Sequence, residues 1–213
     1  MGKKDKATKT VLAAAPSAAI VFPEISLKSE LECRVLLENQ LVVIDDIFSP
    51  RRVNAVKLSD IIVGIQLPLS ILRSGYMLYL RRISLIFLPS KTGRGSVGAA
   101  RAAHSFNSNI RVYKYTPEQY FGPHYDDDCR DTMTGAKSEW TLLIYLTGYE
   151  DGIEGGETLF YQNSKDTTRD IIKAPLTRGS ALLHRHGREC LLHEGSQVVR
   201  GVKYVLRSDV MFM

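Results

Sequence analysis

The sequence predicts a mainly β protein with flanking helices, of the jelly-roll kind. Six or so short strands follow one another at roughly even spacing in the C-terminal half of the chain. Turns that contain glycine separate them, and little helical periodicity lies between them. This spacing is typical of a β-sandwich or barrel, in which antiparallel strands pack around one core.

The expected strands are short runs rich in aliphatic and aromatic residues, as buried strands require. In the C-terminal half they lie within residues 109–117, 138–148, 155–161, 179–186, 189–195 and 201–212. An earlier apolar run, residues 41–50, predicts one more buried strand that ends at a Ser-Pro turn. Gly155, Gly156 and Gly195 are interpreted as turn formers with positive φ.

The chain divides into three parts. Residues 1–28 are rich in Lys, Ala and Thr and predict a flexible basic tail. Residues 29–108 form an N-terminal supporting segment, in which a helix is expected over residues 51–59, with Ser49 as N-cap and Pro50 at its first position. Residues 109–213 form the strand-rich core.

Composition excludes several classes of protein. The net charge of +5 is modest and arises partly from lysines of the basic tail, so we expect no nucleic-acid partner. The most apolar stretch, residues 61–72, is too short to span a bilayer, so no membrane association is expected. Three cysteines without a CxxC spacing indicate a reducing compartment, and hence an intracellular protein of the cytoplasm or nucleus.

The stretch FGPHYDDD, residues 121–128, suggests a metal site. Side chains on a strand repeat every two residues, so His124 and Asp126 on one strand would share a face and offer a nitrogen and a carboxylate. Cys129 follows closely and is interpreted as a passive neighbour. On its own an HxD pair is a weak signal, because most such pairs are surface or hydrogen-bonded residues.

A further histidine strengthens the metal interpretation. His193 lies 67 residues after Asp126, on a different expected strand. Two imidazoles and one carboxylate that leave three adjacent positions open form the ligand set of non-haem Fe(II) oxygenases. His184 and His186 are alternative ligands, and spacing alone does not exclude His184 in place of His193.

Lys203 follows His193 by ten residues and is expected past the turn at Gly201, on the neighbouring strand. A buried ammonium there would hold the far carboxylate of a dicarboxylic acid that chelates the metal with its other end. Arg207 shares the strand parity of Lys203 and is the second candidate for this role, unless it pairs with Asp209 or Glu194.

The motifs RVYKY, HYD, LLIYLTG, GGET and LLHEG, with a lysine ten residues after the last histidine, occur in one order. In this order and spacing the chain resembles the prolyl 4-hydroxylase branch of the 2-oxoglutarate- and Fe(II)-dependent dioxygenases. The resemblance covers about residues 109–213, and it implies a double-stranded β-helix, which is a jelly roll. Residues 51 to about 103 do not match the pattern of this family.

The resemblance implies a role for each matching residue. His124, Asp126 and His193 correspond to the iron ligands, and Lys203 to the residue that binds the distal carboxylate of 2-oxoglutarate. Tyr115, Tyr145 and Thr158 correspond to positions at the co-substrate pocket. The implied reaction uses Fe²⁺, 2-oxoglutarate and O₂, with ascorbate as a supporting reductant, and hydroxylates a C–H bond of a protein or peptide, with a prolyl residue as the leading substrate.

Two other classes of function remain open. One is a metal hydrolase or cupin-like protein that uses the same ligands with zinc or another ion, but such an enzyme has no need of a dicarboxylate anchor like Lys203. The other is a catalytically impaired protein whose unmatched segment has altered the core, and which at most binds a metal or a partner.

Overall fold

The predicted mainly β architecture is confirmed. In this computed structural model the described residues are 32–47, 103–162 and 171–213. Thirteen strands are present among them, and all pair in antiparallel fashion. The strands are β1 (Glu32–Leu37), β2 (Leu41–Asp45), β3 (Ser105–Phe106), β4 (Arg111–Tyr115), β5 (Phe121–His124), β6 (Lys137–Tyr145), β7 (Glu154–Gly155), β8 (Thr158–Tyr161), β9 (Ile171–Lys173), β10 (Ala181–Arg185), β11 (Leu192–Gly195), β12 (Val198–Arg200) and β13 (Lys203–Phe212).

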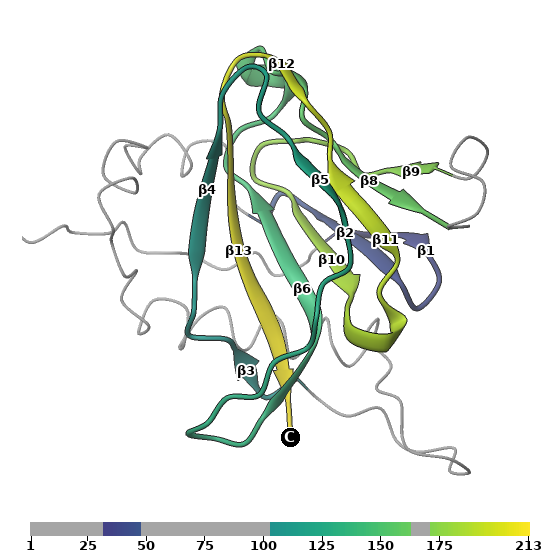
Figure 1. Ribbon diagram of the computed structural model, residues 1–213, viewed down its shortest axis with the longest axis vertical. Helices are drawn as coiled ribbons and strands as arrows, with labels where there is room; N and C mark the ends of the chain where they lie inside the picture. Colours follow the sequence, from purple (N-terminus) through teal and green to yellow (C-terminus); the bar gives the residue numbers. More distant parts are fainter. Residues whose placement is uncertain (1–31, 48–102, 163–170) are drawn as a thin grey trace, which may run out of the picture.

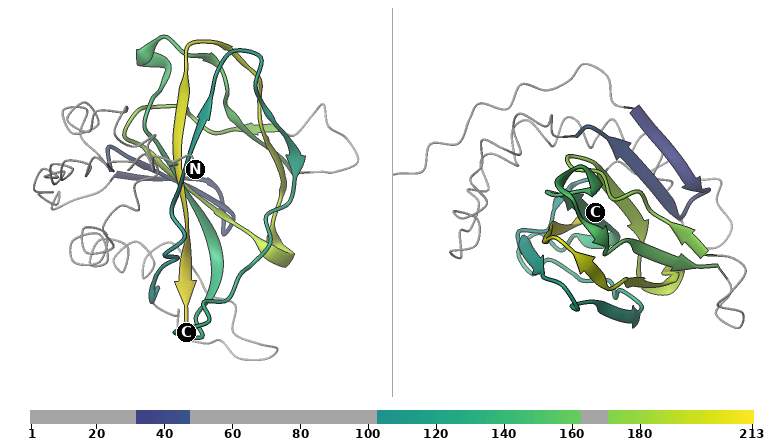
Figure 2. Two further views of the ribbon diagram at one scale, coloured as in Figure 1. Left: turned by 60° about the vertical axis from the view of Figure 1, so that its left-hand side comes forward. Right: turned by 90° about the horizontal axis from the view of Figure 1, so that it is seen from above.

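Two sheets carry most of these strands, in the arrangement of a jelly roll (Figure 1). The major sheet has seven strands in the order β1-β2-β10-β6-β13-β3, and β4 also pairs with β13. The minor sheet has four strands in the order β5-β11-β8-β9, and β12 pairs separately with β7. Strands β1, β2 and β3 come from the expected supporting segment, yet they belong to the major sheet, where β1 and β2 lie at one edge (Figure 2).

Helices contribute little to the described residues. Within them only two single-turn 3₁₀ helices occur, η2 (Tyr149–Asp151) and η3 (Gly187–Glu189). The expected helix over residues 51–59 and the expected tail lie outside the described residues. No helix in the described part of the chain is long and apolar enough to cross a membrane.

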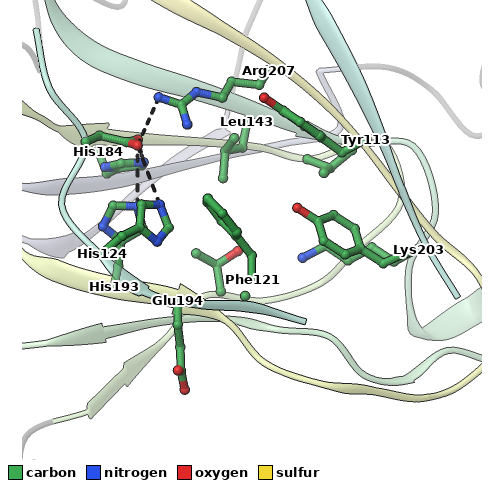
Figure 3. A pocket seen from close by; sticks show the side chains of 14 residues that line it. Tyr113, Phe121, His124, Leu143, His184, His193, Glu194, Lys203 and Arg207 are labelled. Atoms are coloured by element: carbon green, nitrogen blue, oxygen red, sulfur yellow. Dashed lines mark ion pairs between the residues drawn. The ribbon is translucent and has the colours of Figure 1, made fainter. Parts of the chain in front are cut away.

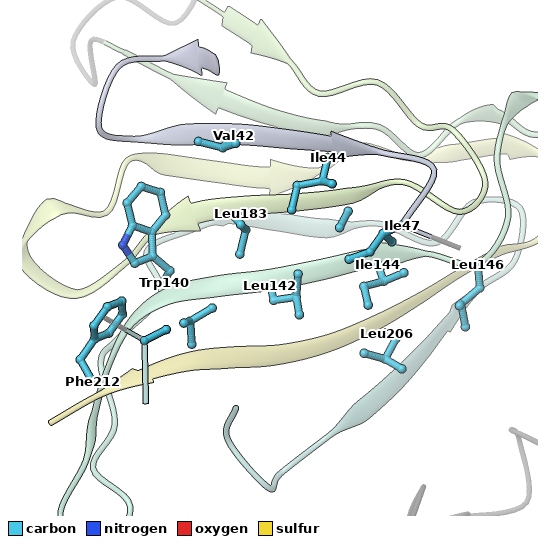
Figure 4. Close-up of a cluster of buried hydrophobic side chains, with 13 residues drawn as sticks. Val42, Ile44, Ile47, Trp140, Leu142, Ile144, Leu146, Leu183, Leu206 and Phe212 are labelled. Atoms are coloured by element: carbon cyan, nitrogen blue, oxygen red, sulfur yellow. The ribbon is translucent and has the colours of Figure 1, made fainter. Parts of the chain in front are cut away.

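Apolar side chains line both faces of the major sheet. Alternate residues of β6 and β10 divide between the two faces, because side chains on a strand alternate. One cluster contains Trp140, Leu142, Ile144 and Leu183, all buried (Figure 4). The other contains Tyr145, Leu182 and Val205, together with Phe160 of the minor sheet, and therefore fills the space between the two sheets.

The predicted positive φ is confirmed at two glycines and is wrong at the third. Gly155 has φ +72° and Gly156 has φ +75°. A Cβ at Gly155 would lie 2.2 Å from the Gln197 carbonyl oxygen, so the GGET turn cannot accept a side chain there. Gly195 ends β11 without a positive φ, and its backbone instead lies against Phe121.

Candidate metal and co-substrate site

A cavity of about 210 Å³ lies between the two sheets. His124, His184 and His193 lie at one end of it and Lys203 at the other (Figure 3), and Asp126, Tyr115 and Thr158 also line it. Phe121 lies between the two ends. The cavity therefore joins a cluster of metal-binding residue types to a buried cation.

The structure brings His124, Asp126 and His193 together. Strands β5 and β11 pair so that His193 lies directly opposite His124. The Nε2 atoms of His124 and His193 lie 3.5 Å and 3.7 Å from the Asp126 carboxylate oxygens, and the three ligand atoms lie within 4.8 Å of one another. One expected detail is wrong, because β5 ends at His124 and Asp126 follows the strand instead of belonging to it.

Hydrogen bonds on the far side of each ring set the orientation of both histidines. His124 Nδ1 donates to the Gly122 carbonyl oxygen at 2.8 Å, and His193 Nδ1 donates to the Leu191 carbonyl oxygen at 2.9 Å. A carbonyl only accepts, so the proton resides on Nδ1 and the Nε2 lone pair points toward Asp126. This is the tautomer that binds metals, and a backbone partner of this kind is usual for a ligating histidine.

The carboxylate of Asp126 is buried and ionised. Burial opposes its ionisation, but His184, Arg207, His193 and the hydroxyl of Thr141 outweigh burial and lower the pKa of Asp126 to about 2. Burial also lowers the pKa values of His184 and His193, so both rings are neutral at pH 7. Arg207, whose Nη2 lies 3.0 Å from Asp126 Oδ1, is therefore the cation that keeps this carboxylate charged at neutral pH.

Metal ions fit this group of side chains. Ligand atoms about 2.0 to 2.2 Å from one metal lie roughly 3 to 3.5 Å from each other, close to the nitrogen-to-oxygen distances of 3.5 Å and 3.7 Å here. Two neutral imidazoles and one carboxylate suit Fe²⁺ as well as zinc. His124, Asp126 and His193 are the residues that would hold the ion.

His184 lies at the same end of the cavity, although only one of His184 and His193 was expected there. Its Nε2 is 3.5 Å from Asp126 Oδ2, and its ring centroid is 4.6 Å from that of His193. His186 does not line the cavity, and its Nδ1–H donates instead to the Thr141 hydroxyl at 2.9 Å.

Cys190, which the sequence did not single out, is the cysteine nearest to these residues. Its Sγ accepts the Asp126 backbone N–H at 3.2 Å and lies 3.8 Å from His193 Nδ1. Burial raises the pKa of Cys190 to about 11, so it is a thiol at neutral pH. Cys129, by contrast, contacts Asn107, Ser138 and Asp209, away from the metal-binding group.

Lys203 lies on β13 of the major sheet, and its side chain reaches the other end of the cavity. The expectation that its strand neighbours the strand of His193 is wrong, because β12 intervenes and β13 belongs to the major sheet. The Lys203 side chain is only 5% exposed, and its Nζ donates to the Gly156 carbonyl oxygen at 2.6 Å. Burial lowers the pKa of Lys203 to about 8, against the opposing effect of Glu157. The ammonium is therefore a buried cation whose remaining donors have room for an anion.

Three further residues, Tyr115, Tyr145 and Thr158, were expected at the co-substrate pocket. Tyr115 pairs with Lys203 across β4 and β13 and lines the cavity, as does Thr158. Tyr145 does not line it but lies behind Thr158, and the two hydroxyls share a hydrogen bond of 2.8 Å. Lys203 Nζ lies 5.5 Å and 5.7 Å from the ring centroids of Tyr115 and Tyr145, so both rings pack against the cation.

Comparison with known proteins finds one matching family model. The model of the 2OG-Fe(II) oxygenase superfamily matches residues 110–208, which contain every strand from β5 to β12 and all the candidate metal ligands. No curated protein matches the chain.

Several solved structures are similar to part of the chain. The viral collagen prolyl hydroxylase of Paramecium bursaria Chlorella virus-1, in complex with 2OG, is 28% identical, with a TM-score of 0.38 over 51% of this chain and 60% of that one. A Pseudomonas putida prolyl-4-hydroxylase is 16% identical, with a TM-score of 0.39 over 70% and 62%. A Trichoplax adhaerens prolyl hydroxylase, bound to a hypoxia inducible factor peptide, is 18% identical, with a TM-score of 0.41 over 54% and 49%.

In each of these structures the match spans less than two thirds of the known protein. The likeness to this superfamily therefore depends on the match to the superfamily model and on the order of the motifs along the chain. The matched segment, residues 110–208, comprises 99 of the 213 residues of the chain.

Proposed function

We propose that this protein is an Fe(II)- and 2-oxoglutarate-dependent dioxygenase that hydroxylates a C–H bond, with succinate and CO₂ as co-products. One observation carries the proposal. Two histidines and an aspartate form a group at one end of a cavity, and a buried lysine lies at its other end. A 2-oxoacid that chelates a metal with one end needs a cation for its other carboxylate, and Lys203 supplies it. When bound, the iron would supply the activation of O₂.

Each residue of the site has a defined task in this proposal. His124, Asp126 and His193 bind the iron, and Arg207 keeps Asp126 charged. Lys203 orients the co-substrate through its distal carboxylate, while Tyr115 and Thr158 shape the wall of the cavity. Phe121 lies between the two ends, and its ring packs against that of His124.

The proposed substrate is a prolyl residue in a protein or peptide, and ascorbate is the proposed supporting reductant. Both assignments come from the resemblance to the prolyl 4-hydroxylase branch. Exposed aromatic side chains next to His124 support a peptide substrate: Tyr120 is 66% exposed, Phe121 48% and Tyr125 55%. Aromatic rings in such positions provide stacking surfaces for proline and other apolar side chains.

Binding of the iron and of 2-oxoglutarate is tested directly by spectroscopy. Under anaerobic conditions, addition of Fe(II) and 2-oxoglutarate to the protein should produce a weak visible charge-transfer band. In air, succinate should form, and faster with proline-containing peptides than without them. A folded protein that gives neither the band nor succinate would refute the dioxygenase proposal.

Replacing Lys203 with methionine should weaken the binding of 2-oxoglutarate about 10- to 100-fold, because a hydrogen bond to a charged group contributes roughly 1.5 to 3 kcal/mol. Titration with 2-oxoglutarate in the presence of Mn(II) measures the affinity without turnover. Lys114→Met is the matched control, since Lys114 lies on the neighbouring strand β4 but is exposed. Equal affinities in the two variants would show that Lys203 does not anchor the co-substrate.

The affinity for 2-oxoglutarate measured in this titration should depend on pH. With a pKa of about 8, Lys203 is protonated and able to bind a carboxylate below pH 8. The affinity for 2-oxoglutarate should therefore be constant from pH 6.5 to 7.5 and fall as the pH rises above 8, by up to about tenfold per pH unit. In Lys203→Arg the guanidinium stays charged throughout, so this variant should lose the dependence. An unchanged pH profile in Lys203→Arg would assign the titration to another group.

A further inference from the structure

Glu157 is a buried acid to which the proposed reaction gives no task. It belongs to the GGET turn and is only 8% exposed. The hydroxyls of Tyr149 and Ser196 donate to its carboxylate at 2.9 Å and 2.8 Å. Lys173 Nζ lies 2.6 Å from its Oε1, and its backbone carbonyl accepts the Ser196 N–H at 2.8 Å. Glu157 therefore ties η2, β9 and the turn between β11 and β12 to the GGET turn.

The residues on either side of Glu157 both contact the end of the cavity at which Lys203 lies. The carbonyl oxygen of Gly156 accepts Lys203 Nζ at 2.6 Å. The stem of the lysine packs against the same glycine, since a Cβ built there would lie 3.4 Å from Lys203 Cδ. On the other side of Glu157, Thr158 lines the cavity. A movement of Glu157 would therefore displace the carbonyl group that holds the lysine.

The charge of Glu157 also favours the protonated form of Lys203. Burial opposes ionisation of Glu157, but Lys173 and the hydrogen bonds outweigh burial and lower the pKa of Glu157 to about 2. The carboxylate is therefore charged at neutral pH, and it opposes the effect of burial on Lys203.

No other acid in the described part of the cavity wall has this relation to Lys203. Apart from the metal-binding group, the other titratable groups that line the cavity or pack against the ammonium are tyrosines or side chains paired elsewhere. They are Tyr113 and Tyr115 of β4, Tyr145 of β6, Glu194 of β11, which accepts the Tyr161 hydroxyl at 2.7 Å, and Arg207 of β13, which pairs with Asp126.

We propose that Glu157 is a positioning residue for the co-substrate, which holds Lys203 in place through the GGET turn and keeps its ammonium charged. This inference rests on the proposed function and extends it, because the distal carboxylate of 2-oxoglutarate needs a cation that is both fixed and protonated. Glu157 itself does not touch the co-substrate. Its effect on binding should therefore pass entirely through Lys203.

The pH dependence of 2-oxoglutarate binding in Glu157→Gln tests this proposal. The substitution removes the charge but keeps the shape of the side chain, and the amide oxygen can still accept the Tyr149 hydroxyl. In titrations with Mn(II), the affinity should begin to fall about one pH unit lower than in the wild type, since loss of a nearby opposite charge shifts a pKa by roughly this amount or more. Glu154→Gln is the matched control, because Glu154 is exposed and pairs with Arg200. It should keep the wild-type profile.

A second background separates positioning from a merely structural role. In Lys203→Arg the cation stays charged, so adding Glu157→Gln should leave the affinity independent of pH. An equal loss of affinity in both backgrounds, with no change in the pH at which the affinity falls, would overturn the inference. Thermal unfolding shows whether each variant folds.

Lys173→Met tests the same coupling if Glu157→Gln does not fold. The Lys173 side chain is 56% exposed, so its removal should leave the fold intact. Because it removes a cation that opposes Glu157, the affinity should fall at a higher pH than in the wild type. General destabilisation does not produce a shift in this direction. An unchanged or lower pH in Lys173→Met would overturn the inference.

A measurement without co-substrate separates this inference from the proposed function. NMR of protein labelled with ¹³C-lysine follows the titration of Lys203, whose resonance is the one missing from Lys203→Arg. Its midpoint should be lower in Glu157→Gln than in the wild type and in Glu154→Gln. A lower midpoint in a protein that does not bind 2-oxoglutarate would refute the proposed function but support the coupling of Glu157 to Lys203. Binding of 2-oxoglutarate through Lys203 with an unchanged midpoint would overturn this inference alone.

Discussion

Replacement of Asp126 with alanine is expected to lower the affinity for a divalent metal by at least about 100-fold and to abolish succinate formation. Asp126 is the only carboxylate of the proposed ligand set, and the Nε2 atoms of three histidines lie 3.5 to 3.7 Å from it. Changes to groups that merely orient ligands cost 10- to 100-fold, so loss of a ligand should cost at least as much. Titration with Mn(II) measures the affinity.

Asp127→Ala provides the matched control, because Asp127 is an exposed acid in the same loop. It should bind Mn(II) as the wild type does. Similar losses in the two variants would show that the acidic stretch attracts cations generally and that Asp126 has no special role.

Asp126 should also affect how the free energy of unfolding of the metal-free protein changes at acid pH. Its pKa is lowered from the ordinary 3.8 to about 2, so its contribution to stability is present above pH 4 and is lost as the pH falls from about 4 to 2. The metal-free wild type should therefore lose more stability over this range than metal-free Asp126→Ala. Parallel curves would contradict the ionised, paired carboxylate described above.

Replacement of Phe160 with alanine should destabilise the metal-free protein by about 3 to 5 kcal/mol, the usual cost of removing a buried aromatic ring. Phe160 is fully buried between the sheets. Its ring stacks on that of His193, with centroids 5.3 Å apart, and meets the His184 ring edge-on at 5.2 Å. The cavity left by the substitution would lie directly beneath the two histidines. Urea denaturation followed by circular dichroism measures the change.

Tyr120→Ala is the control for this stability measurement. Tyr120 is an aromatic residue of similar size that is 66% exposed, so its removal should change the free energy of unfolding by no more than about 0.5 kcal/mol. A loss below 1 kcal/mol in Phe160→Ala would mean that the ring does not support the histidines.

Much of the fold follows from the sequence because the strands of the C-terminal half are strongly patterned. The apolar runs that became β6, β10 and β13 contain about half of the buried hydrophobic core, and most of their residues are buried. Other strands were not expected. β1 has no fully buried residue and β3 has only two residues, so neither carries a hydrophobic pattern long enough to detect.

The proposed metal ligands were accessible to sequence reasoning because a two-residue spacing and a lysine at a fixed distance mark them. The residues around them were not. Thr141, Cys190 and Arg207 contact Asp126 from three distant parts of the chain, and only the folded structure brings them near it. His184 shows the same limit: its spacing allowed it to replace His193, but only the position of β10 opposite the minor sheet shows that both histidines lie at the site.

The pairing of His124 with His193 across β5 and β11 has a consequence for how the protein would withstand heat and denaturants. The two residues are distant in the chain, so an ion bound to both acts as a cross-link between segments that separate on unfolding. Binding to the native state alone contributes about 2.7 kcal/mol when the free ion is at 100 times its Kd. The melting temperature should therefore follow the supply of metal, and a chelator alone should bring the holoprotein closer to denaturation.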